Sequence, residues 1–332
     1  MKNYLKSNKL FRSLPEIKQK AQKKIFYKKW NWLETGSEYG NTLQANLDSF
    51  KNYKLIPRFQ LIKKKKIKFL NKFLKIPLII APMGHLTQFH TNGEAEVALG
   101  AKEYGTFITI SSLSRINLKE IKNYSKISLL IYQIYFYNSR KWVEEEIERA
   151  IEVGCKAIVV TIDSAAPSFK YKTLYDKYDA RKFGRRSNFN NLIKKPYYPT
   201  WKDLVWLKKK LGKVPLIIKG LMHADDASKA FGIGASSVWI SNHGGRAFES
   251  CYSSLEALKT IRKKLGKNKH LIFDGGIRTG SDIIKAIHAG ANIVAVGRPI
   301  IYGLICKGYK GVFETLMLFQ KEYETSRLLS GH

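Results

Sequence analysis

The sequence contains little cysteine, no long apolar run and few acidic residues. Its 332 residues include only Cys155, Cys251 and Cys306, which are too few and too widely spaced for a disulfide framework or a cysteine-based metal site. We therefore expect a cytoplasmic protein without a bound metal. No apolar run approaches the roughly 18 residues of a membrane span, and the N-terminus has no signal-peptide core. We expect no integral membrane segment.

The shortage of acidic residues leaves a large positive charge. Lys and Arg number 59 against 26 Asp and Glu, a formal net charge of +33. Such a charge is compatible with binding to nucleic acid, an anionic membrane or an acidic substrate. The lysines are spread along the chain instead of forming one basic arm, which favours solvated helix faces in a lysine-rich composition. We therefore expect no nucleic-acid partner.

Short apolar runs that end in glycine and polar residues dominate the segment from Lys219 to Pro299. The sequences that follow these runs are KG, SNHGGR, DGGIRTG and GRP. Runs of this kind, separated by amphipathic helical segments, are typical of buried parallel strands. The four runs are Leu216–Ile218, Val238–Ile240, Leu271–Phe273 and Ile293–Val296.

Four similar runs precede them and bring the count to eight. The intervening segments predict helices, including Gly93–Tyr104 and one capped by Asn138 or Ser139. Eight strands alternating with helices indicate a (β/α)8 TIM barrel, in which the loops after the strands form the active site. The earlier runs are Leu78–Ala81, Thr106–Ile110, Leu129–Ile134 and Ala157–Ile162, and the apolar face expected for the capped helix is Val143, Ile147, Ala150 and Ile151.

The remaining segments are expected to surround this barrel in one overall domain. Residues 1–77 form an N-terminal helical cap and a barrel-bottom segment, and residues 78–332 form the barrel. Near the N-terminus, Asn41 or Thr42 is expected to cap a helix, and the Lys63–Lys66 region forms a hairpin. Residues 164–199 make a long loop after strand four that resembles a lid. Two later helices are expected, one after Thr200 and one over Val312–Leu329.

The last two strands end in residues suited to an anion. Gly275, Gly276 and Gly297 leave their backbone amides accessible, while Arg278 and Arg298 add positive charge. A helix that starts near Ser281 contributes its N-terminal dipole. The loops after the last two strands are the usual phosphate site of this barrel, so we expect a phosphate group there.

The combination IIKG, SNHGGR, FDGGIRTG and VGRP, in this order, resembles the FMN-dependent 2-hydroxy acid oxidases and dehydrogenases. This family includes glycolate oxidase, lactate oxidase and mandelate dehydrogenase, and the resemblance runs from about Phe26 to Gly331. It implies an FMN-dependent oxidoreductase that oxidises a small-molecule 2-hydroxy acid, or a related substrate, to the oxo product. It also implies a homo-oligomer, as in the tetramers of the family.

The resemblance assigns an FMN site residue by residue. Backbone groups near Gly84 would face the flavin N5, and Lys219 would lie near N1, where negative charge develops on reduction. The residues implied for the cofactor are Pro82, Met83, Gly84, Ser111, Gln133, Thr161, Lys219, Ser241, Asp274, Gly275, Gly276, Arg278, Gly297 and Arg298.

The same resemblance assigns the catalytic residues. His243 would act as the base, a task that suits an imidazole near neutral pH. Asp163 would orient His243 and stabilise its protonated form. Arg246 would bind the substrate carboxylate in a bidentate manner, and the hydroxyl of Tyr135 would contact the substrate. Lys219 completes this catalytic set.

Two substrate-site positions depart from the family pattern. Trp32 occupies the position of a tyrosine that binds the substrate carboxylate, unless Tyr27 or Tyr39 supplies that hydroxyl. Lys170 replaces an arginine. Because an indole offers one donor and a broad apolar face, a bulkier or non-standard substrate is expected.

Two alternatives remain open. One is another FMN barrel enzyme, an isomerase or dehydrogenase of a specialised pathway that acts on a larger or peptide-derived substrate. The inosinate dehydrogenases place a nucleophilic cysteine after a barrel strand, and no cysteine here follows a strand in that way. The other is a non-enzymatic protein that uses its positive field to bind nucleic acid or a membrane surface. Such a protein should carry its basic residues on one face, whereas this sequence retains a full catalytic set.

Overall fold

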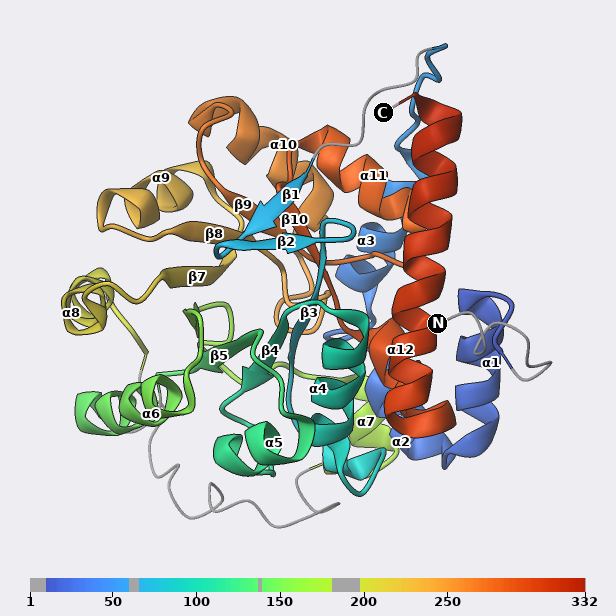
Figure 1. The fold of residues 1–332 in the computed structure, drawn as a ribbon, viewed down its shortest axis with the longest axis horizontal. Helices are drawn as coiled ribbons and strands as arrows, with labels where there is room; N and C mark the ends of the chain where they lie inside the picture. Colours follow the sequence, from blue (N-terminus) through green and yellow to red (C-terminus); the bar gives the residue numbers. More distant parts are fainter. Residues whose placement is uncertain (1–9, 60–65, 137–138, 181–197, 332) are drawn as a thin grey trace.

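Parallel strands close into a barrel in the computed structural model, which describes residues 10–59, 66–136, 139–180 and 198–331 (Figure 1). The strand order around the closed barrel is β10-β3-β4-β5-β6-β7-β8-β9, so neighbours in the sequence are neighbours in the sheet. The predicted (β/α)8 barrel is confirmed. The strands are β3 (Leu78–Met83), β4 (Ile108–Ser111), β5 (Leu130–Ile134), β6 (Ile158–Thr161), β7 (Leu216–Leu221), β8 (Ser237–Ile240), β9 (Leu271–Phe273) and β10 (Ile293–Val296).

Helices surround the barrel, and side-chain caps fix where several of them begin. Ser139 caps α6, and Thr200 forms the predicted capping box with Asp203 at α8. The face predicted for α6 is correct except at Ile151, which is 49% exposed. The helices that follow the strands, with one short 3-10 turn, are η1 (Leu86–Gln88), α4 (Gly93–Tyr104), α5 (Leu118–Ser125), α6 (Arg140–Val153), α7 (Tyr171–Tyr175), α8 (Trp201–Leu211), α9 (Ala224–Gly232), α10 (Ser254–Leu265), α11 (Gly280–Ala289) and α12 (Arg298–Ser330).

Alternate residues of each strand enter two different cores. On β8, Trp239 packs with Ile217 and Ile272 inside the barrel, while Val238 and Ile240 belong to the larger core between barrel and helices. Both faces of every strand are therefore buried, which is why the strands appear in the sequence as continuous apolar runs.

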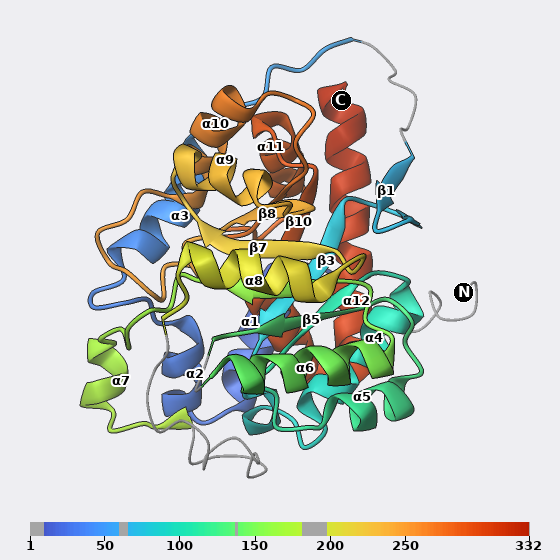
Figure 2. The same ribbon diagram turned by 90° about the vertical axis from the view of Figure 1, so that its left-hand side faces the viewer.

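The N-terminal segment packs helices and a hairpin against the barrel. Its elements are α1 (Leu14–Lys24), α2 (Tyr27–Glu34), α3 (Asn41–Asn52), β1 (Ile67–Phe69) and β2 (Lys72–Leu74). Phe69 and Leu74 of the hairpin join the barrel-interior core, as expected for a segment that closes the bottom. Figure 2 shows the hairpin on the side of the molecule opposite α2 and α7. Helix α2 is thus at the end of the barrel where the strands finish.

Two predicted boundaries in these segments are wrong. The cap of α3 is Gly40, in a left-handed conformation with φ 88°, and neither Asn41 nor Thr42. Thr42 is instead buried in the first turn, where its hydroxyl donates to the backbone carbonyl of Glu249. Helix α12 starts at Arg298, and its backbone leaves the helical region at Lys307 and Gly308. The helix expected at Val312–Leu329 is the straight part after this kink, beside α1 and α4 (Figure 1).

Two expectations fall partly outside the described residues. The run Lys63–Lys66 is described only at its last residue. The expected lid includes residues 181–197, which also lie outside the description. Its described part contains α7, whose residues follow Lys170 directly.

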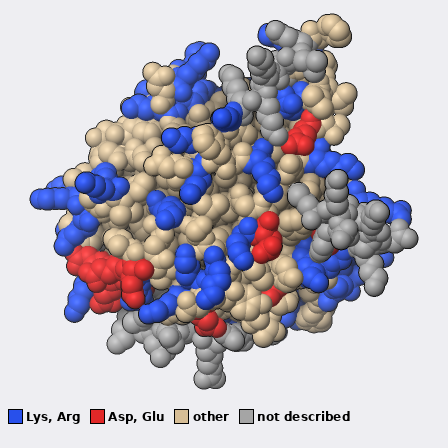
Figure 3. All heavy atoms as spheres, in the orientation of Figure 1, with Lys and Arg blue, Asp and Glu red and all other residues tan. Residues whose placement is uncertain are grey.

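Basic side chains are distributed over the whole visible face of the molecule instead of forming one patch (Figure 3). Acidic side chains gather over α6, whose sequence RKWVEEEIERAIEV is rich in glutamate. This distribution agrees with the expectation that the lysines solvate helix faces. Within the described residues, no helix is long and apolar enough to cross a membrane.

Candidate active site

A cavity of about 700 Å³ lies where the strands end, and the predicted site residues gather around it. Every residue assigned to the cofactor, the substrate or catalysis lines this cavity, apart from Gln133, Asp163 and Ser241. Each of those three lies behind the lining and forms a hydrogen bond with a lining residue. Gln133 accepts from Ser111, Asp163 accepts from His243, and Ser241 accepts from Lys219. The cavity thus has an inner layer of groups and a supporting layer, as an active site requires.

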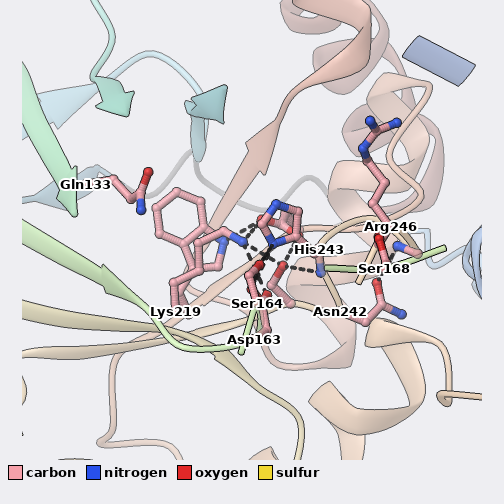
Figure 4. Close-up of polar contacts among 12 residues, drawn as sticks. Gln133, Asp163, Ser164, Ser168, Lys219, Asn242, His243 and Arg246 are labelled. Carbon is pink, nitrogen blue, oxygen red and sulfur yellow. Dashed lines mark hydrogen bonds and ion pairs between the residues drawn. The ribbon is translucent and has the colours of Figure 1, made fainter. Parts of the chain in front are cut away.

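His243 and Asp163 form the central pair of this site. The imidazole Nδ1 lies 2.7 Å from Asp163 Oδ1. Burial raises the pKa of Asp163, but the charges of His243 and Lys219 outweigh it and hold that pKa at about 2. The carboxylate is therefore ionised and can only accept, so Nδ1 is the donor in this hydrogen bond and Nε2 is not engaged by it. Figure 4 shows these side chains converging with Lys219.

A left-handed backbone turn presents His243 to the cavity. Its φ is 57°, and Gly244 and Gly245 continue the turn with φ values of 64° and 73°. The backbone amide of His243 donates to Ser241 Oγ over 3.0 Å. A Cβ at Gly245 would meet the backbone of Leu43 at 2.4 Å, so only glycine fits there. This explains the glycine pair after His243 in the sequence.

Lys219 is buried between two carboxylates. It is 4% exposed, with Nζ 2.9 Å from Ser241 Oγ. Asp163 Oδ2 and Asp274 Oδ2 lie 3.8 Å and 3.6 Å from Nζ. A buried ammonium needs such partners because its desolvation is costly. Two carboxylates therefore surround one buried ammonium beside His243.

Two buried polar groups at the deep end of the site lack a partner among the described residues. Thr161 Oγ1 belongs to a residue that lines the cavity, and Gln133 Nε2 belongs to one just behind the lining. Gln133 Oε1 is already occupied, because it accepts from Ser111 Oγ over 2.7 Å. Leaving a buried donor unpaired costs about 1–3 kcal/mol, so this arrangement indicates a ligand with a polar edge. The pyrimidine edge of a flavin, which alternates carbonyl oxygens and N–H, matches this requirement.

A second part of the cavity suits an anion. Gly275 and Gly276 follow β9 with φ values of 106° and 90°, and they line the cavity together with Arg278 and Arg298. Burial and the neighbouring charge of Arg278 lower the pKa of Arg298. Two guanidinium groups close enough to repel each other favour an anion between them. Helix α11 begins at Gly280, close to the predicted start.

Arg246 and Arg298 also tie the end of α2 to the barrel. Arg246 Nη1 donates to the carbonyls of Trp32 and Thr35, each over 2.9 Å, and Arg298 Nε donates to Leu33 O over 3.0 Å. Two cations at a helix C-terminus complement its dipole. The N-terminal segment is therefore part of the site and not only a cover.

The two positions that depart from the family pattern both line the cavity. The Arg246 guanidinium lies 4.8 Å from the centroid of the Trp32 ring, and Phe89 packs against the same indole. Lys170 Nζ donates to Ser168 Oγ, and burial followed by the charge of Arg246 lowers the pKa of Lys170 to about 8. These contacts place Trp32 and Lys170 around Arg246.

The alternative tyrosines at the N-terminus lie away from the cavity. Tyr27 and Tyr39 are 55% and 83% exposed, and neither lines the cavity. Tyr39 instead contacts the ring of Tyr171 in the loop after β6. Of the three candidates, only Trp32 lines the cavity, and its role stays a prediction.

Sequence reasoning missed two residues that touch the central cluster. Ser164 Oγ donates to Asp163 Oδ1 over 3.1 Å, and Trp239 Nε1 donates to Asp274 Oδ2 over 2.9 Å. A signal for each was present. Ser164 follows Asp163 directly in the sequence. Trp239 is two residues before Ser241, and residues two apart along an extended strand point to the same side.

These features define a barrel protein whose cavity suits a planar phosphorylated cofactor beside a histidine–carboxylate pair. Residues 21–332 match the family model described as FMN-dependent dehydrogenase. The chain is 32% identical to a 2-hydroxyacid oxidase of Dictyostelium discoideum, over 98% of this chain and 89% of that one. It is also 32% identical to an L-lactate oxidase of a Nostoc species, over 96% and 94% of the two chains.

Solved structures of related proteins have the same fold. A crystal structure of mandelate oxidase superposes with a TM-score of 0.91 at 27% identity, covering 97% of this chain and 95% of the other. The chain therefore belongs to the FMN-dependent dehydrogenase family. It is an FMN-dependent oxidoreductase that acts on a CH–OH group, as predicted.

Proposed function

We propose that this protein oxidises a 2-hydroxy acid to the 2-oxo acid, with His243 as the base and Arg246 as the carboxylate anchor. The observation that carries the proposal is the 2.7 Å contact between His243 Nδ1 and the ionised Asp163, which leaves Nε2 free to accept a proton in the cavity. The printed names of the relatives, 2-hydroxyacid oxidase and L-lactate oxidase, support the substrate class. They favour it over an isomerase or a peptide-modifying enzyme.

Each residue has a definite task in this reaction. Arg246 fixes the substrate carboxylate through a planar guanidinium. The hydroxyl of Tyr135, also in the cavity lining, contacts the substrate. His243 Nε2 takes the proton from the substrate hydroxyl. The imidazolium that results is stabilised by Asp163, whose low pKa keeps it ionised throughout the reaction.

FMN, when bound, would supply the acceptor for the two electrons and the hydrogen removed from the substrate carbon. Gln133 and Thr161 would hold the polar edge of its ring, and Lys219 would lie near N1. Backbone groups of Pro82, Met83 and Gly84 would border the ring. The ribityl chain and its phosphate would be held by Asp274, Gly275, Gly276, Arg278, Gly297 and Arg298. Ser111 would join Gln133 and Thr161 at the polar edge of the ring, and Ser241 would support Lys219.

The test is anaerobic flavin reduction by candidate substrates. The purified protein, loaded with FMN, is mixed with glycolate, lactate, mandelate and longer or bulkier 2-hydroxy acids while the flavin absorbance is followed. We expect bleaching by at least one 2-hydroxy acid and formation of its oxo product. A protein that holds FMN but is bleached by none of them contradicts the proposed substrate class.

Trp32 predicts poor use of small substrates. If the indole fails to replace a tyrosine hydroxyl, one hydrogen bond to the substrate carboxylate is missing, which costs about 1.5–3 kcal/mol. We expect Trp32→Tyr to raise kcat/KM for glycolate or lactate by about one to two orders of magnitude, measured by stopped-flow flavin reduction. Trp206→Tyr is the matched control, because Trp206 also stacks on an arginine, Arg140, away from the cavity. Fast reduction of the wild type by lactate, with no gain in Trp32→Tyr, contradicts this role.

Lys170 predicts a loss of substrate affinity at alkaline pH. Its pKa of about 8 lies below that of an ordinary lysine, so the side chain becomes neutral as the pH rises through 8. We expect KM for an anionic substrate to rise about tenfold between pH 7 and pH 9 as this charge is lost. Lys170→Arg should flatten the profile because arginine stays protonated, whereas the exposed Lys172→Arg should not. An equal rise of KM in Lys170→Arg would assign the effect to another group.

We propose, further, that the protein acts in the cytoplasm as a homo-oligomer on a small-molecule substrate, without a nucleic-acid partner. The three cysteines are unpaired, which suits a reducing compartment. Size-exclusion chromatography with light scattering measures the oligomeric state directly. A monomer at micromolar concentration contradicts the homo-oligomer.

A further inference from the structure

Among the described residues, five lysine and arginine side chains line the active-site cavity. They are Lys170, Lys219, Arg246, Arg278 and Arg298. Lys219 is paired with the carboxylates of Asp163 and Asp274, and the last two arginines stand where the cofactor phosphate is expected. Lys170 and Arg246 remain. They lie near each other, because burial and the charge of Arg246 both lower the pKa of Lys170.

These two cations have no acidic partner in the protein. No Asp or Glu side chain among the described residues forms an ion pair with Lys170 or Arg246, and the residues outside the description include no Asp or Glu. Glu34 acts on Arg246 through its charge, but its carboxylate is paired with Lys18 at 2.8 Å. A cation that is partly removed from water needs an anion nearby. The two positive charges therefore indicate two negative charges on a ligand.

Arg246 offers one edge of its guanidinium to a ligand. All of its side-chain hydrogen bonds to the protein come from Nη1, which donates to backbone carbonyls at the end of α2. The ring of Trp32 lies against the guanidinium, 4.8 Å from its centre. Within the described residues, Nε and Nη2 donate to no protein group. Together they form one planar edge, which matches the two oxygens of a single carboxylate. A monocarboxylic substrate would therefore use Arg246 completely.

Lys170 is a second anion-binding group, and tertiary contacts fix its position. Ser168 Oγ donates to the backbone carbonyl of Arg246 over 2.6 Å, and Figure 4 shows Ser168 beside that backbone. Lys170 Nζ donates to the same hydroxyl. The carbonyl of Phe169 accepts from the backbone amide of Glu38 over 2.6 Å. An ammonium has three N–H groups, so the one bond to a neutral hydroxyl leaves donors for an anion.

We propose that Lys170 binds a second anionic group of the substrate, so that the preferred substrate is a 2-hydroxy acid with two negative charges, such as a 2-hydroxy dicarboxylic acid. The inference rests on the proposed function, because it takes Arg246 to hold the carboxylate next to the reacting carbon. A monoanionic acid leaves the Lys170 ammonium without a counter-charge. A second carboxylate, or a phosphate, supplies it. Lys170 is thus a residue that determines specificity.

The test compares 2-hydroxyglutarate with its terminal amide, which has the same length and one negative charge less. Flavin reduction is followed by stopped flow in the FMN-loaded protein at pH 7, where Lys170 is protonated. We expect kcat/KM to be about 10- to 100-fold higher for the diacid, the usual effect of a hydrogen bond between charged groups. In Lys170→Met this preference should fall to about threefold or less. Lys170→Arg should keep it because the charge is retained.

Lys172→Met is the matched control. Lys172 is exposed on α7 and does not line the cavity, so this variant should keep the wild-type preference. Terminally phosphorylated glycerate, compared with glycerate in the same assay, shows whether phosphate can replace the second carboxylate. Faster reduction by the phosphorylated acid, lost in Lys170→Met, also supports the inference.

Equilibrium binding provides a readout that does not depend on turnover. The product 2-oxoglutarate and its terminal amide are titrated into the FMN-loaded protein while the flavin spectrum is followed. We expect the dissociation constant of the diacid to be about tenfold lower in the wild type. In Lys170→Met the two constants should be alike. Bound FMN in this variant shows that the site is intact.

Two results overturn the inference. One is a wild type that treats each dianionic acid and its monoanionic counterpart equally. The other is an equal loss for 2-hydroxyglutarate and its amide in Lys170→Met, because Lys170 would then share the single carboxylate held by Arg246. Flavin reduction by no 2-hydroxy acid at all contradicts the proposed function instead. In that case, the binding titration still reports whether Lys170 selects the second charge.

Discussion

Replacing His243 by asparagine should leave FMN bound and slow its reduction by a 2-hydroxy acid by about 10²- to 10⁴-fold, the usual contribution of a general base. Asparagine is the appropriate replacement because His243 has a φ of 57°, and asparagine tolerates the left-handed region better than most residues. The amide cannot accept and retain a proton, so the chemical step loses its base. Stopped-flow measurement of flavin bleaching gives the rate.

His223 provides the matched control for this variant. It is exposed, caps α9 by accepting from the backbone amide of Asp225, and can be replaced by asparagine without losing the cap. His223→Asn should reduce flavin at the wild-type rate. A wild-type rate in His243→Asn would show that another group takes the proton, and the assignment of the base would be wrong.

Arg246→Lys should lower kcat/KM by about 10²-fold or more, because a lysine cannot form the paired hydrogen bonds of a guanidinium with a carboxylate. Losing one such bond to a charged group costs about 1.5–3 kcal/mol. The positive charge is kept, so geometry and not charge is the quantity under test. Steady-state kinetics with a 2-hydroxy acid, such as mandelate, provides the measurement.

A neutral substrate separates the two roles of Arg246. This arginine also donates to the carbonyls of Trp32 and Thr35, so its replacement can disturb the end of α2. A disturbance of α2 should affect a 2-hydroxy amide and the matching 2-hydroxy acid equally. Loss of the carboxylate contact should affect the acid much more than the amide. Equal losses for both would contradict the role of Arg246 as carboxylate anchor.

The barrel was predictable because its strands are buried on both faces. A strand of this kind appears in the sequence as a short apolar run, and glycine marks where it ends, as at Phe273 and Val296. In a parallel barrel, all such ends meet at one side, so His243, Lys219 and Asp274 could be brought together before any coordinates. The positions of α3 and α12 were less predictable. Helix α3 starts after a left-handed Gly40, and α12 starts at Arg298 and kinks at Gly308; apolar periodicity indicates neither feature.

The resemblance to a family supplied roles that composition and spacing do not contain. Residues as distant as Asp163 and His243 were paired by that resemblance, and the structure brings their side chains to 2.7 Å. The roles of Trp32 and Lys170 are different, because both depart from the pattern. Their contacts with Arg246 appear only when the N-terminal segment and the loop after β6 are packed against the barrel.

The sequence by itself determined the barrel, the strand ends that form its active site and the phosphate site, because these depend on local apolar runs and on motifs at fixed positions; FMN as the cofactor came from the family resemblance. Only the tertiary structure decided which groups reach the cavity and which support it. It places Gln133, Asp163 and Ser241 in the supporting layer. It turns the indole N–H of Trp239 towards Asp274, a residue 35 positions away. The period of a strand fixes which face a side chain occupies, whereas the partner it finds there depends on how the other strands pack around the same interior.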